Sequence, residues 1–570
     1  MDNNKLFNVL ITNTGESVPV ALGTPLSEIA EKYCGGYVTD SKTGLKYPVL
    51  AALVDHKLKE LGYCVTVMGE IQFIGYNDDN GRRTYGRSLC LLLQKSVRDI
   101  LPGKVLIISH SLPSGMYCRL LDEPHGATYR ISDDEIEALE RRMDELRSAD
   151  LPLIKEYVLA SEAKDLFRSQ GQPDKAALLE SLGKYTSKLY RIDSYRDSFH
   201  GPLVPSTKYL TKFALAPFSE GFCLQLPMVN DFSRLLPMSR KSKVSDTLSE
   251  YAQWCNIVHI NGVGTLNQAI IEGHSRGIIN VAEALHSRKY AAIADEIKAR
   301  GSRIVFIAGP SSSGKTSSSL RIALQCRVIG LNPKVIELDN YFVDRERTPL
   351  DENGEYDFES LHAMDLELLG SNILDLIAGR EVTIPRFDFK TGSRVPGGTP
   401  MRLGENDILI MEGIHALNPE MTPSVPSDKI FRVYASALTS LYMDENNNIS
   451  TTDNRLLRRM IRDNRVRGIT PEQTILRWPS VRRGENRNIF PFQENADAIF
   501  NSALIFELPL LKYYAEPLLR RIHPSSPAYT EAIRMLKFLS YIVALTPEEI
   551  AAVPPTSILR EFIGGQTLSD

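Results

Sequence analysis

Long apolar runs and paired cysteines are both missing from this sequence. No apolar stretch approaches the roughly 20 residues that a membrane-spanning helix needs, and the residues after Met1 lack the basic and apolar parts of a secretory signal. The seven cysteines form no C-x-x-C pair, and their odd number argues against a disulfide framework. We therefore expect reduced thiols, no contact with membranes and a cytoplasmic location.

A strong excess of charge of either sign is also missing. The formal net charge is -4, so no global basic field attracts nucleic acid, and any such contact would need a local patch. The hydrophobic content of 43% and the charged content of 24% are typical of a folded globular protein. At 570 residues the chain exceeds one core of about 100–200 residues. These values predict a multidomain enzyme.

The front half of the sequence mixes helices with short strands. Residues 1–70 alternate short strands with one helix at Leu26–Tyr33, which predicts a small α+β module. Residues 71–235 continue this mixture, and their clearest helix begins at Ser132, where a glutamate three residues later completes a capping-box pattern. Residues 236–300 are expected to form a helical connector.

From Arg303 onward, apolar strands alternate with helical or loop segments. The expected strands are Ile304–Ala308, Val335–Leu338, Ile408–Met411 and Ile430–Val433. This alternation is typical of a parallel sheet in an α/β domain. We therefore predict an α/β domain over residues 301–510, followed by a helical C-terminal segment over residues 511–570.

A phosphate-binding loop is indicated between the first of these strands and the next helix. Residues Gly309–Thr316 match G-x-x-x-x-G-K-[ST] in that structural context. Backbone N–H groups and the helix N-terminus would hold phosphates, Lys315 would bridge the terminal phosphates, and Thr316 would bind magnesium. We predict ATP and Mg²⁺ as cofactors, bound by Gly309, Ser311, Ser312, Ser313, Gly314, Lys315, Thr316 and Ser317.

Two carboxylates follow predicted strands. Asp339 comes directly after Val335–Leu338, and Glu412 comes directly after Ile408–Met411. Ligands of open α/β sheets bind at the carboxyl ends of the strands, so both side chains should face the phosphate loop. We assign Asp339 as the general base and Glu412 as an acid that binds magnesium directly or through water. The alternative is that each merely caps the turn that follows it.

Arginine is concentrated between Arg455 and Arg487, where ten arginines occur with no lysine and three acids. Four of them share one helical face, namely Arg455, Arg458, Arg459 and Arg462. Planar guanidinium groups in such an array can clamp phosphoryl oxygens, which predicts a lid over the phosphates. A solvated helix face and an RNA-contacting patch are the alternative interpretations.

The combined motifs resemble the uridine/cytidine kinase and phosphoribulokinase family over residues 303–510. The motifs are Gly309–Thr316, Asp339–Phe342, Tyr356-Asp357, Pro385–Phe389, Glu412-Gly413 and Arg458–Gly468. The resemblance implies that Asp339 is the base for a ribose 5′-hydroxyl and that Asp357 holds ribose hydroxyls. It also implies catalytic roles for Lys315 and Glu412 and places Tyr341, Phe387 and Arg394 at the substrate. The phosphate lid would consist of Arg459, Arg462 and Arg467.

The chain departs from this family where the base is recognised. Uridine kinases usually present a tyrosine and a histidine to the pyrimidine edge, whereas this chain has Phe387 and Gly392. Losing hydrogen-bonding groups should relax or redirect the preference for the base. The expected activity is ATP-dependent phosphorylation of a nucleoside 5′-hydroxyl, and a sugar phosphate, a vitamin precursor or another alcohol stays open as the acceptor.

The asparagine-rich segment Asp444–Asn448 does not predict a calcium site. An EF-hand loop needs glycine and glutamate at defined positions, and this chain has Ile449 and Arg455 there.

The front half resembles tRNA-handling modules. Residues 5–70 look like a TGS module, and residues 71–235 look like the second additional domain of threonyl-tRNA synthetase, most clearly in Tyr190–Thr207. The synthetase domain edits with an H-x-x-x-H pair and a C-x-x-x-H pair. In this chain the corresponding four positions hold Arg87, Leu91, Phe199 and Leu203. These residues cannot bind metal or relay protons, so we expect no editing activity and interpret His200 as an ordinary partly buried histidine.

The tRNA-related resemblance supports a second hypothesis for the whole chain. The front modules could contact RNA, which would make the protein a nucleotide-gated regulator that binds RNA or ribosomes. A kinase acting on a small-molecule substrate is the favoured hypothesis, because loop, base and acid are all present. The sequence predicts no particular oligomeric state.

Overall fold

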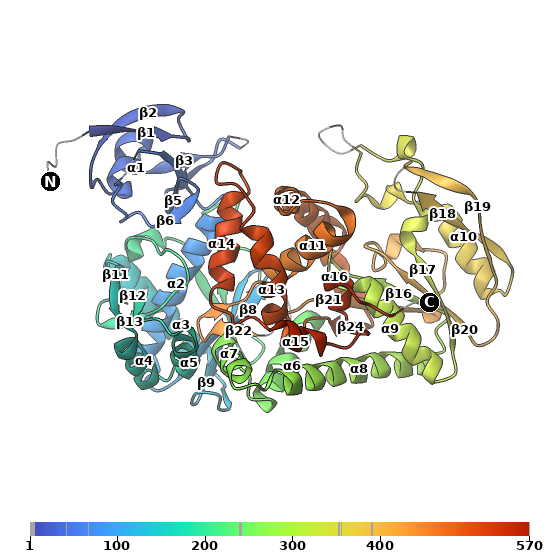
Figure 1. Cartoon of the computed structure of the whole chain (residues 1–570). Coiled ribbons are helices and arrows are strands. Elements are labelled where there is room, and N and C mark those ends of the chain that lie inside the picture. The colour runs from blue at the N-terminus through green and yellow to red at the C-terminus, as the bar shows by residue number, and fades with distance from the viewer. Residues whose placement is uncertain are drawn as a thin grey trace.

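The computed structural model describes residues 6–568 apart from 42, 67, 239–241, 351–353, 355, 389–390 and 440, so Phe389 of the predicted motif lies outside the described residues. The N-terminal module lies at one end of the molecule, and the sheet of the predicted α/β unit lies at the other (Figure 1). One long helix, α8 (Ser275–Arg300), runs beneath the centre toward that sheet. This arrangement confirms a multidomain chain with α+β modules followed by an α/β unit.

A five-stranded parallel sheet forms the core of the predicted α/β unit. The strand order is β17-β20-β16-β21-β24, and all four pairings are parallel. Unbroken apolar runs are typical of strands covered on both faces, and every residue of β16 is buried. The last strand was not predicted from the sequence. The strands are β16 (Ile304–Ala308), β17 (Asn332–Glu337), β20 (Asp407–Glu412), β21 (Ile430–Ser436) and β24 (Ala498–Asn501).

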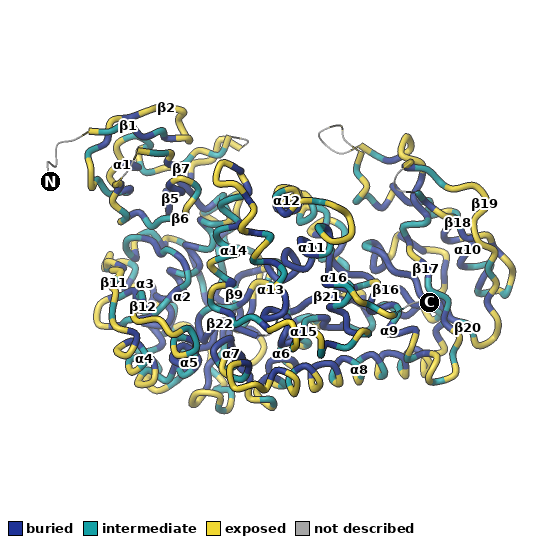
Figure 2. Tube along the Cα trace, in the orientation of Figure 1, coloured by how far each residue is buried: buried dark blue, intermediate teal, exposed yellow. Residues whose placement is uncertain are grey.

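The helices around this sheet include the segment predicted to be a connector. α8 packs beside α9 (Lys315–Val328), where the Tyr290 and Ser318 hydroxyls lie 3.0 Å apart. The Tyr290 ring also stacks on Phe500 of β24 at 4.1 Å between centroids. Buried and exposed residues alternate along α8 (Figure 2), so one face of the helix belongs to the core under the sheet. Two shorter helices precede it, α6 (Lys243–Ile257) and α7 (Val263–Ile271).

An additional layer lies beside the 3-10 turn that follows β17. α10 (Leu366–Ile377) packs against the hairpin β18 (Val382–Asp388) and β19 (Ser393–Met401). The helices α11 (Thr451–Arg467) and α12 (Pro471–Asn488) follow β21 and carry the arginine-rich sequence. They place that sequence above the carboxyl ends of the strands (Figure 1).

The N-terminal module is a five-stranded sheet with one helix. Its strand order is β2-β1-β7-β5-β6, and α1 (Leu26–Cys34) covers the buried face. A separate two-stranded pair, β3 and β4, lies next to it. The strands are β1 (Leu6–Ile11), β2 (Glu16–Ala21), β3 (Tyr37–Thr39), β4 (Lys46–Pro48), β5 (Ala51–Val54), β6 (Lys57–Lys59) and β7 (Glu70–Ile74).

The second module packs helices against two antiparallel sheets. α3 (Asp133–Ser148) begins with the predicted capping box of Ser132 and Glu135, and it lies beside α2 (Asp79–Ile100). The first sheet contains β8 (Val105–Leu112), β9 (Gly115–Leu121), β10 (Thr128–Tyr129), β14 (Ala214–Phe218) and β15 (Gly221–Gln225). The second contains β11 (Ile154–Leu159), β12 (Thr186–Ile192) and β13 (Tyr195–Asp197), with α4 (Ala160–Ser169) and α5 (Pro173–Leu182) beside it.

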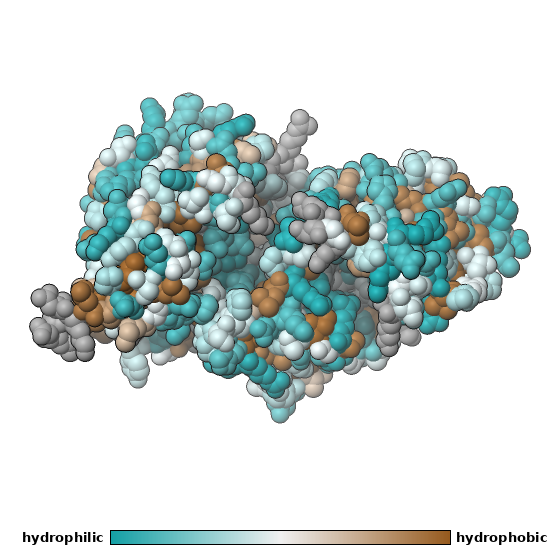
Figure 3. Space-filling view, turned by 90° about the horizontal axis from the view of Figure 1, so that it is seen from above, coloured by the Kyte–Doolittle hydropathy of each residue, from teal (hydrophilic) through white to brown (hydrophobic). Residues whose placement is uncertain are grey.

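The C-terminal segment is helical, as predicted, and returns to the sheet. α13 (Glu507–Leu519) and α14 (Tyr529–Leu539) are followed by the short α15 (Pro547–Ala551) and α16 (Arg560–Ile563). None of the helices in the described ranges is both long enough and apolar enough to cross a bilayer. The face shown in Figure 3 is mainly hydrophilic, with hydrophobic residues in small separate patches.

Candidate active site

The predicted phosphate loop connects β16 to α9 in a backbone shape that needs glycine. A Cβ atom at Gly309 would lie 2.0 Å from the carbonyl oxygen of Ala435, and Gly314 adopts a φ of +82°. α9 begins at Lys315, so the unpaired N–H groups of its first turn point toward the loop. This geometry is suited to an anion above the helix N-terminus.

The two predicted carboxylates meet this loop at the carboxyl edge of the sheet. Glu412 is the last residue of β20, and the Thr316 hydroxyl donates a hydrogen bond to it. Asp339 lies in the 3-10 turn after β17, and this strand ends at Glu337, one residue before the predicted end at Leu338. Burial raises the pKa of Asp339 to about 6, and the nearby Lys315 ammonium opposes this rise. Loop and carboxylates therefore lie together at this edge of the sheet.

The pKa of Glu412 is raised further, to about 7. Burial is the main cause, and the Asp339 and Glu337 carboxylates add to it, whereas Lys315 and the Thr316 hydrogen bond oppose it. Asp339 and Glu412 thus both lie near one lysine. A cation between them would relieve their mutual repulsion.

The residues at this edge fit magnesium bound together with phosphates. Glu412 and Thr316 supply adjacent hard oxygen ligands, and the described residues contain no group of three His, Cys, Asp or Glu side chains that encloses an ion by itself. Mg²⁺ usually takes one or two carboxylates and completes its shell with phosphates and water. The buried hydroxyls of Ser312 and Ser313 also have no hydrogen-bond partner among the described residues.

The arginine-rich helix α11 contacts the backbone of the phosphate loop. Arg455 is buried, pairs with Glu485 and donates from Nε to the Ser311 carbonyl oxygen at 3.0 Å. Glu485 Oε1 accepts a hydrogen bond from the Ser311 N–H group at 2.9 Å. Both backbone groups of Ser311 are therefore held by one buried ion pair.

Arg458 makes a second buried clamp. It pairs with Glu507 of α13, with Nη2 and Oε2 2.8 Å apart, and its Nη1 lies 3.4 Å from the Ser312 carbonyl oxygen. The prediction that Arg455 and Arg458 belong to a phosphate lid is therefore wrong. Their guanidinium groups point into the protein and saturate buried carboxylates, because this face of the amphipathic helix packs on the loop.

The other three arginines of the predicted lid lie around Asp463. Arg459 Nη1 donates to the Ser311 hydroxyl at 2.7 Å, and its Nε lies 3.2 Å from Asp463. Arg462 and Arg467 contact the same carboxylate at 3.1 and 3.4 Å. The Arg467 guanidinium opposes the rise in the pKa of Asp339, so it lies near that carboxylate.

The residues predicted to hold the acceptor have different surroundings in the structure. Asp357 lies in a loop, with Oδ2 3.1 Å from Arg487 Nη1. Tyr341 is buried and accepts a hydrogen bond from Asn372 at 3.2 Å, which gives it a packing role. Phe387 packs on Phe342 with the ring centroids 5.7 Å apart.

Arg394 ties the β18–β19 hairpin to the turn that carries Asp339. Its Nη2 atom lies 3.0 Å from Asp365, and its Nε donates to the Phe342 carbonyl oxygen at 3.1 Å. A Cβ at Gly392 would lie 2.7 Å from Arg345 Nε, so this glycine permits close contact with an arginine. Both residues therefore shape the wall beside the cleft.

Sequence reasoning missed Glu359 and His415. Burial raises the pKa of Glu359, Glu485 adds to the rise, and Lys315 and Arg459 oppose it, so this carboxylate faces the phosphate loop. Burial lowers the pKa of His415 to about 4, which leaves the imidazole neutral near Asp357. The Glu412-Gly-Ile-His415 spacing was the available signal for the histidine, whereas Glu359 sits in a loop without a distinguishing pattern.

The C-terminal segment also reaches the loop, which no sequence pattern indicated. Glu561 accepts a hydrogen bond from the Ser317 hydroxyl at 2.7 Å and lies 3.4 Å from the Ser317 nitrogen. Gln566 donates to the same hydroxyl at 2.8 Å. A Cβ on Gly314 would meet Ile558 at 2.3 Å. A carboxylate therefore lies against the first turn of α9, close to where phosphates would bind.

Comparisons with known proteins divide the chain in the same way. The model of the phosphoribulokinase / uridine kinase family matches residues 304–505. A uridine kinase from Macrococcus caseolyticus (strain JCSC5402) is 31% identical over 197 residues, which cover 34% of this chain and 86% of that protein. A solved structure of a possible uridine kinase from Bacillus stearothermophilus is 18% identical, with a TM-score of 0.23, over 35% of this chain and 88% of that one.

The front of the chain matches a different protein. A threonine–tRNA ligase from Syntrophotalea carbinolica (strain DSM 2380 / NBRC 103641 / GraBd1) is 31% identical over 181 residues, which are 32% of this chain. The chain spans 28% of the length of that ligase. Both resemblances expected from the motifs are thus confirmed.

The buried clamp on the phosphate loop can be tested with Arg458→Ala. This change leaves Glu507 buried without its partner, which typically costs about 3–5 kcal/mol. We expect a marked fall in the melting temperature, measured by calorimetry, and weaker ATP binding. The exposed Arg477→Ala on α12 is the matched control. A melting temperature equal to that of the control would contradict the clamp.

The contact from the C-terminal segment can be tested with Glu561→Gln. Removing a negative charge beside the helix N-terminus should favour bound phosphates by about 0.3–1 kcal/mol. We therefore expect the Kd for ATP, measured by calorimetry, to fall about two- to fivefold. Glu548→Gln on α15 changes an exposed glutamate and should have no effect. An unchanged or larger Kd in Glu561→Gln would show that the Glu561 carboxylate does not weaken the binding of phosphates.

Proposed function

The chain belongs to the phosphoribulokinase / uridine kinase family, and on this premise we propose that it transfers the terminal phosphoryl group of ATP to the 5′-hydroxyl of a nucleoside. The observation that carries the proposal is the proximity of Lys315, Asp339 and Glu412 at the carboxyl edge of the sheet. A kinase of small alcohols needs a phosphate cradle, a base and a charge-neutralising site in one place. All three functions have a candidate residue here.

In this proposal each residue acts on a defined atom. Asp339 accepts the proton of the acceptor hydroxyl as its oxygen attacks the γ-phosphorus, and ADP leaves. Lys315 and the first-turn N–H groups of α9 hold the phosphate oxygens. Magnesium, when held by Glu412 and Thr316, would offset negative charge on the phosphates. Arg462 and Arg467 would stabilise the transferred group, while Arg459 would orient the loop through the Ser311 hydroxyl.

The acceptor would lie between the base and the β18–β19 wall. Asp357 is the candidate for holding ribose hydroxyls, and its pairing with Arg487 would have to yield or be shared. Phe387 is largely buried against Phe342, so it offers a base an apolar contact but no hydrogen bond. This observation favours a second candidate, a non-nucleoside alcohol as the acceptor.

A panel of acceptors tests the proposal. ATP consumption by the purified chain should rise with uridine or cytidine above its rate with a sugar or a hydroxy acid. Asp339→Asn should lower kcat about 10²–10⁴-fold, because it removes the base, while ATP still binds. Asp375→Asn, on the outer face of α10, is the control. Normal ATP binding with no phosphoryl transfer to any nucleoside would refute the nucleoside proposal.

The raised pKa of Asp339 predicts the pH dependence of the reaction. The base must be ionised, and burial raises its pKa to about 6, so kcat/KM should fall as the pH drops through that value. Glu412 should be held ionised by saturating magnesium and should not add a second limb. Steady-state rates between about pH 5 and pH 8 measure this limb. A rate that stays flat to the lowest pH would contradict Asp339 as the base.

A further inference from the structure

A large cavity, whose described lining contains no residue of the phosphate loop, lies between the second module and the C-terminal helices. Its volume is about 470 Å³, which is in the range of small-molecule sites. Its walls come from α2, from α14 and from a hairpin of β22 (Tyr442–Asp444) and β23 (Asn447–Asn448) that follows β21. The position equivalent to one editing residue of the synthetase, Arg87, lies in this lining.

The cavity is strongly cationic. Its described lining contains five arginine or lysine side chains and one carboxylate, that of Asp453; the cations are Arg82, Arg83, Arg87, Arg534 and Lys537. Arg82 pairs with Asp79, and Arg534 pairs with Asp453. Among the described residues, no carboxylate lies within 4.0 Å of the cationic nitrogens of Arg83, Arg87 or Lys537. Three cations therefore line the cavity without a carboxylate partner. Of these, Arg87 already donates from Nε and Nη2 to the Pro202 carbonyl oxygen at 3.2 Å.

The cations also disfavour one another. Burial, together with the nearby Arg87 and Lys155, lowers the pKa of Lys537 to about 8. The neighbouring Lys188 has its pKa lowered to about 7 by burial and by Lys537. Burying like charges together costs free energy, and an anion placed among them would recover it.

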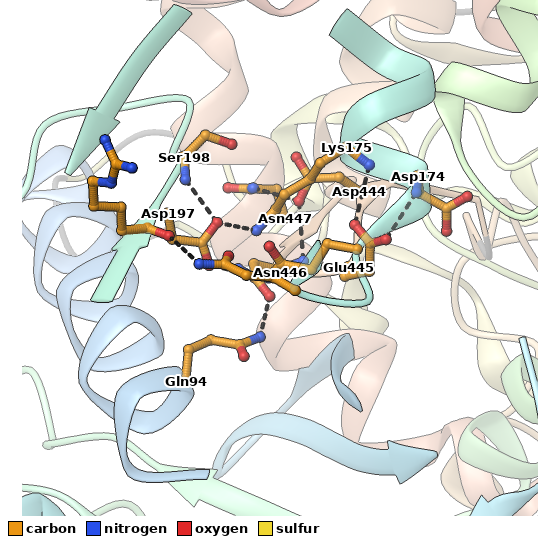
Figure 4. A network of polar contacts seen from close by, with 12 residues as sticks. Gln94, Asp174, Lys175, Asp197, Ser198, Asp444, Glu445, Asn446 and Asn447 are labelled. Atoms are coloured by element: carbon orange, nitrogen blue, oxygen red, sulfur yellow. Dashed lines mark hydrogen bonds and ion pairs between the residues drawn. The ribbon is translucent and has the colours of Figure 1, made fainter. Parts of the chain in front are cut away.

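The β22–β23 hairpin, which lines one side of the cavity, is held in place by hydrogen bonds to the second module. Figure 4 shows Glu445 and Asn446 among side chains of α2, α5 and the β13 end. Glu445 accepts hydrogen bonds from the Asp174 and Lys175 N–H groups at 2.8 and 3.2 Å, at the start of α5. Asn446 bonds to Gln94 and Asp197. The segment that was considered for calcium thus binds protein groups instead.

The remaining lining suits the uncharged part of a ligand. Met116, Leu236 and Phe538 supply apolar surface, and Tyr541 supplies an aromatic ring. His200, which bonds to Asp444 at 2.8 Å and meets the Tyr541 ring edge-on at 4.4 Å, lies between the cavity and the hairpin. Its neutral form is favoured by burial, which lowers its pKa.

We propose that this cavity binds a phosphorylated small molecule of nucleotide size, with its phosphate on Arg83, Arg87 and Lys537 and its uncharged part against Met116, Phe538 and Tyr541. A small ligand fits better than a polynucleotide, because α14 and the hairpin wall the cavity on two sides. The assignment concerns a site separate from the phosphate loop and does not depend on which alcohol the chain phosphorylates.

The site has a direct structural connection to the phosphate loop. Arg534 of α14 binds both oxygens of Asp453 at 2.7 Å, and Asp453 lies in the first turn of α11. Two and five residues further along the same helix, Arg455 and Arg458 contact the carbonyl oxygens of Ser311 and Ser312. A phosphate that competes for Arg534 would therefore change the contact at the start of the helix that holds the loop.

Binding is tested by calorimetry on the full chain carrying Lys315→Ala, which weakens phosphate binding at the loop. Uridine 5′-monophosphate, adenosine 5′-monophosphate and ribose 5-phosphate are the probes, with uridine as the phosphate-free match. We expect at least one phosphorylated probe to bind, and Lys537→Gln and Arg83→Gln each to weaken it by about tenfold. Arg520→Gln removes an exposed cation of α13 and should leave the affinity unchanged.

Each outcome decides the assignment. Affinities that Lys537→Gln and Arg83→Gln leave unchanged, with circular dichroism showing both variants folded, would overturn it. Equal competition by sulfate would show a general anion site and would also overturn it. Tighter, substitution-sensitive binding of tRNA with no binding of the small probes would replace the small molecule by RNA. In the wild-type chain the bound probe should change the KM for ATP at least about twofold, and an unchanged KM would refute the connection through Arg534.

Discussion

Two buried arginine–glutamate pairs determine the shape of the phosphate loop. Arg455 with Glu485 and Arg458 with Glu507 hold the backbone of Ser311 and Ser312 from the side opposite the cleft. The loop alone could not hold this shape, because its left-handed residues and unpaired N–H groups are costly without support. Since the four charged groups come from α11, α12 and α13, the packing of these helices sets the cradle for the nucleotide.

The packing of helices around the loop also explains why the C-terminal segment contributes to the site. The helices after β24 are one hydrophobic unit with α8 and the sheet, and their last turn places Glu561 on Ser317. The acidic edge opposite, formed by Asp339 and Glu412, is destabilised in its ionised form by burial. A phosphate-bound cation would relieve that cost, so the site is arranged for a ligand at some expense in stability.

The junction between the two halves combines a buried polar network with apolar packing of α5 on α7. A short hairpin sends Glu445 and Asn446 into the second module, where they saturate the start of α5 and contact α2. Buried polar networks are stable only when nearly every partner is present, so this junction specifies one arrangement of the halves. It also leaves beside it a cavity whose described lining holds five cationic side chains and one carboxylate.

The sequence by itself determined the parallel sheet, the phosphate loop and the residues at the strand ends. These features depend on local patterns, namely unbroken apolar strands, glycines at a tight turn and polar residues where strands stop. It also identified both resemblances, which the relatives confirm. Only the tertiary structure decided that Arg455 and Arg458 are clamps, that Glu359 and Glu561 approach the loop, and that three cations share a cavity. These facts depend on contacts between segments that are from 30 to 244 residues apart, and no periodicity along the chain records which segments will pack together.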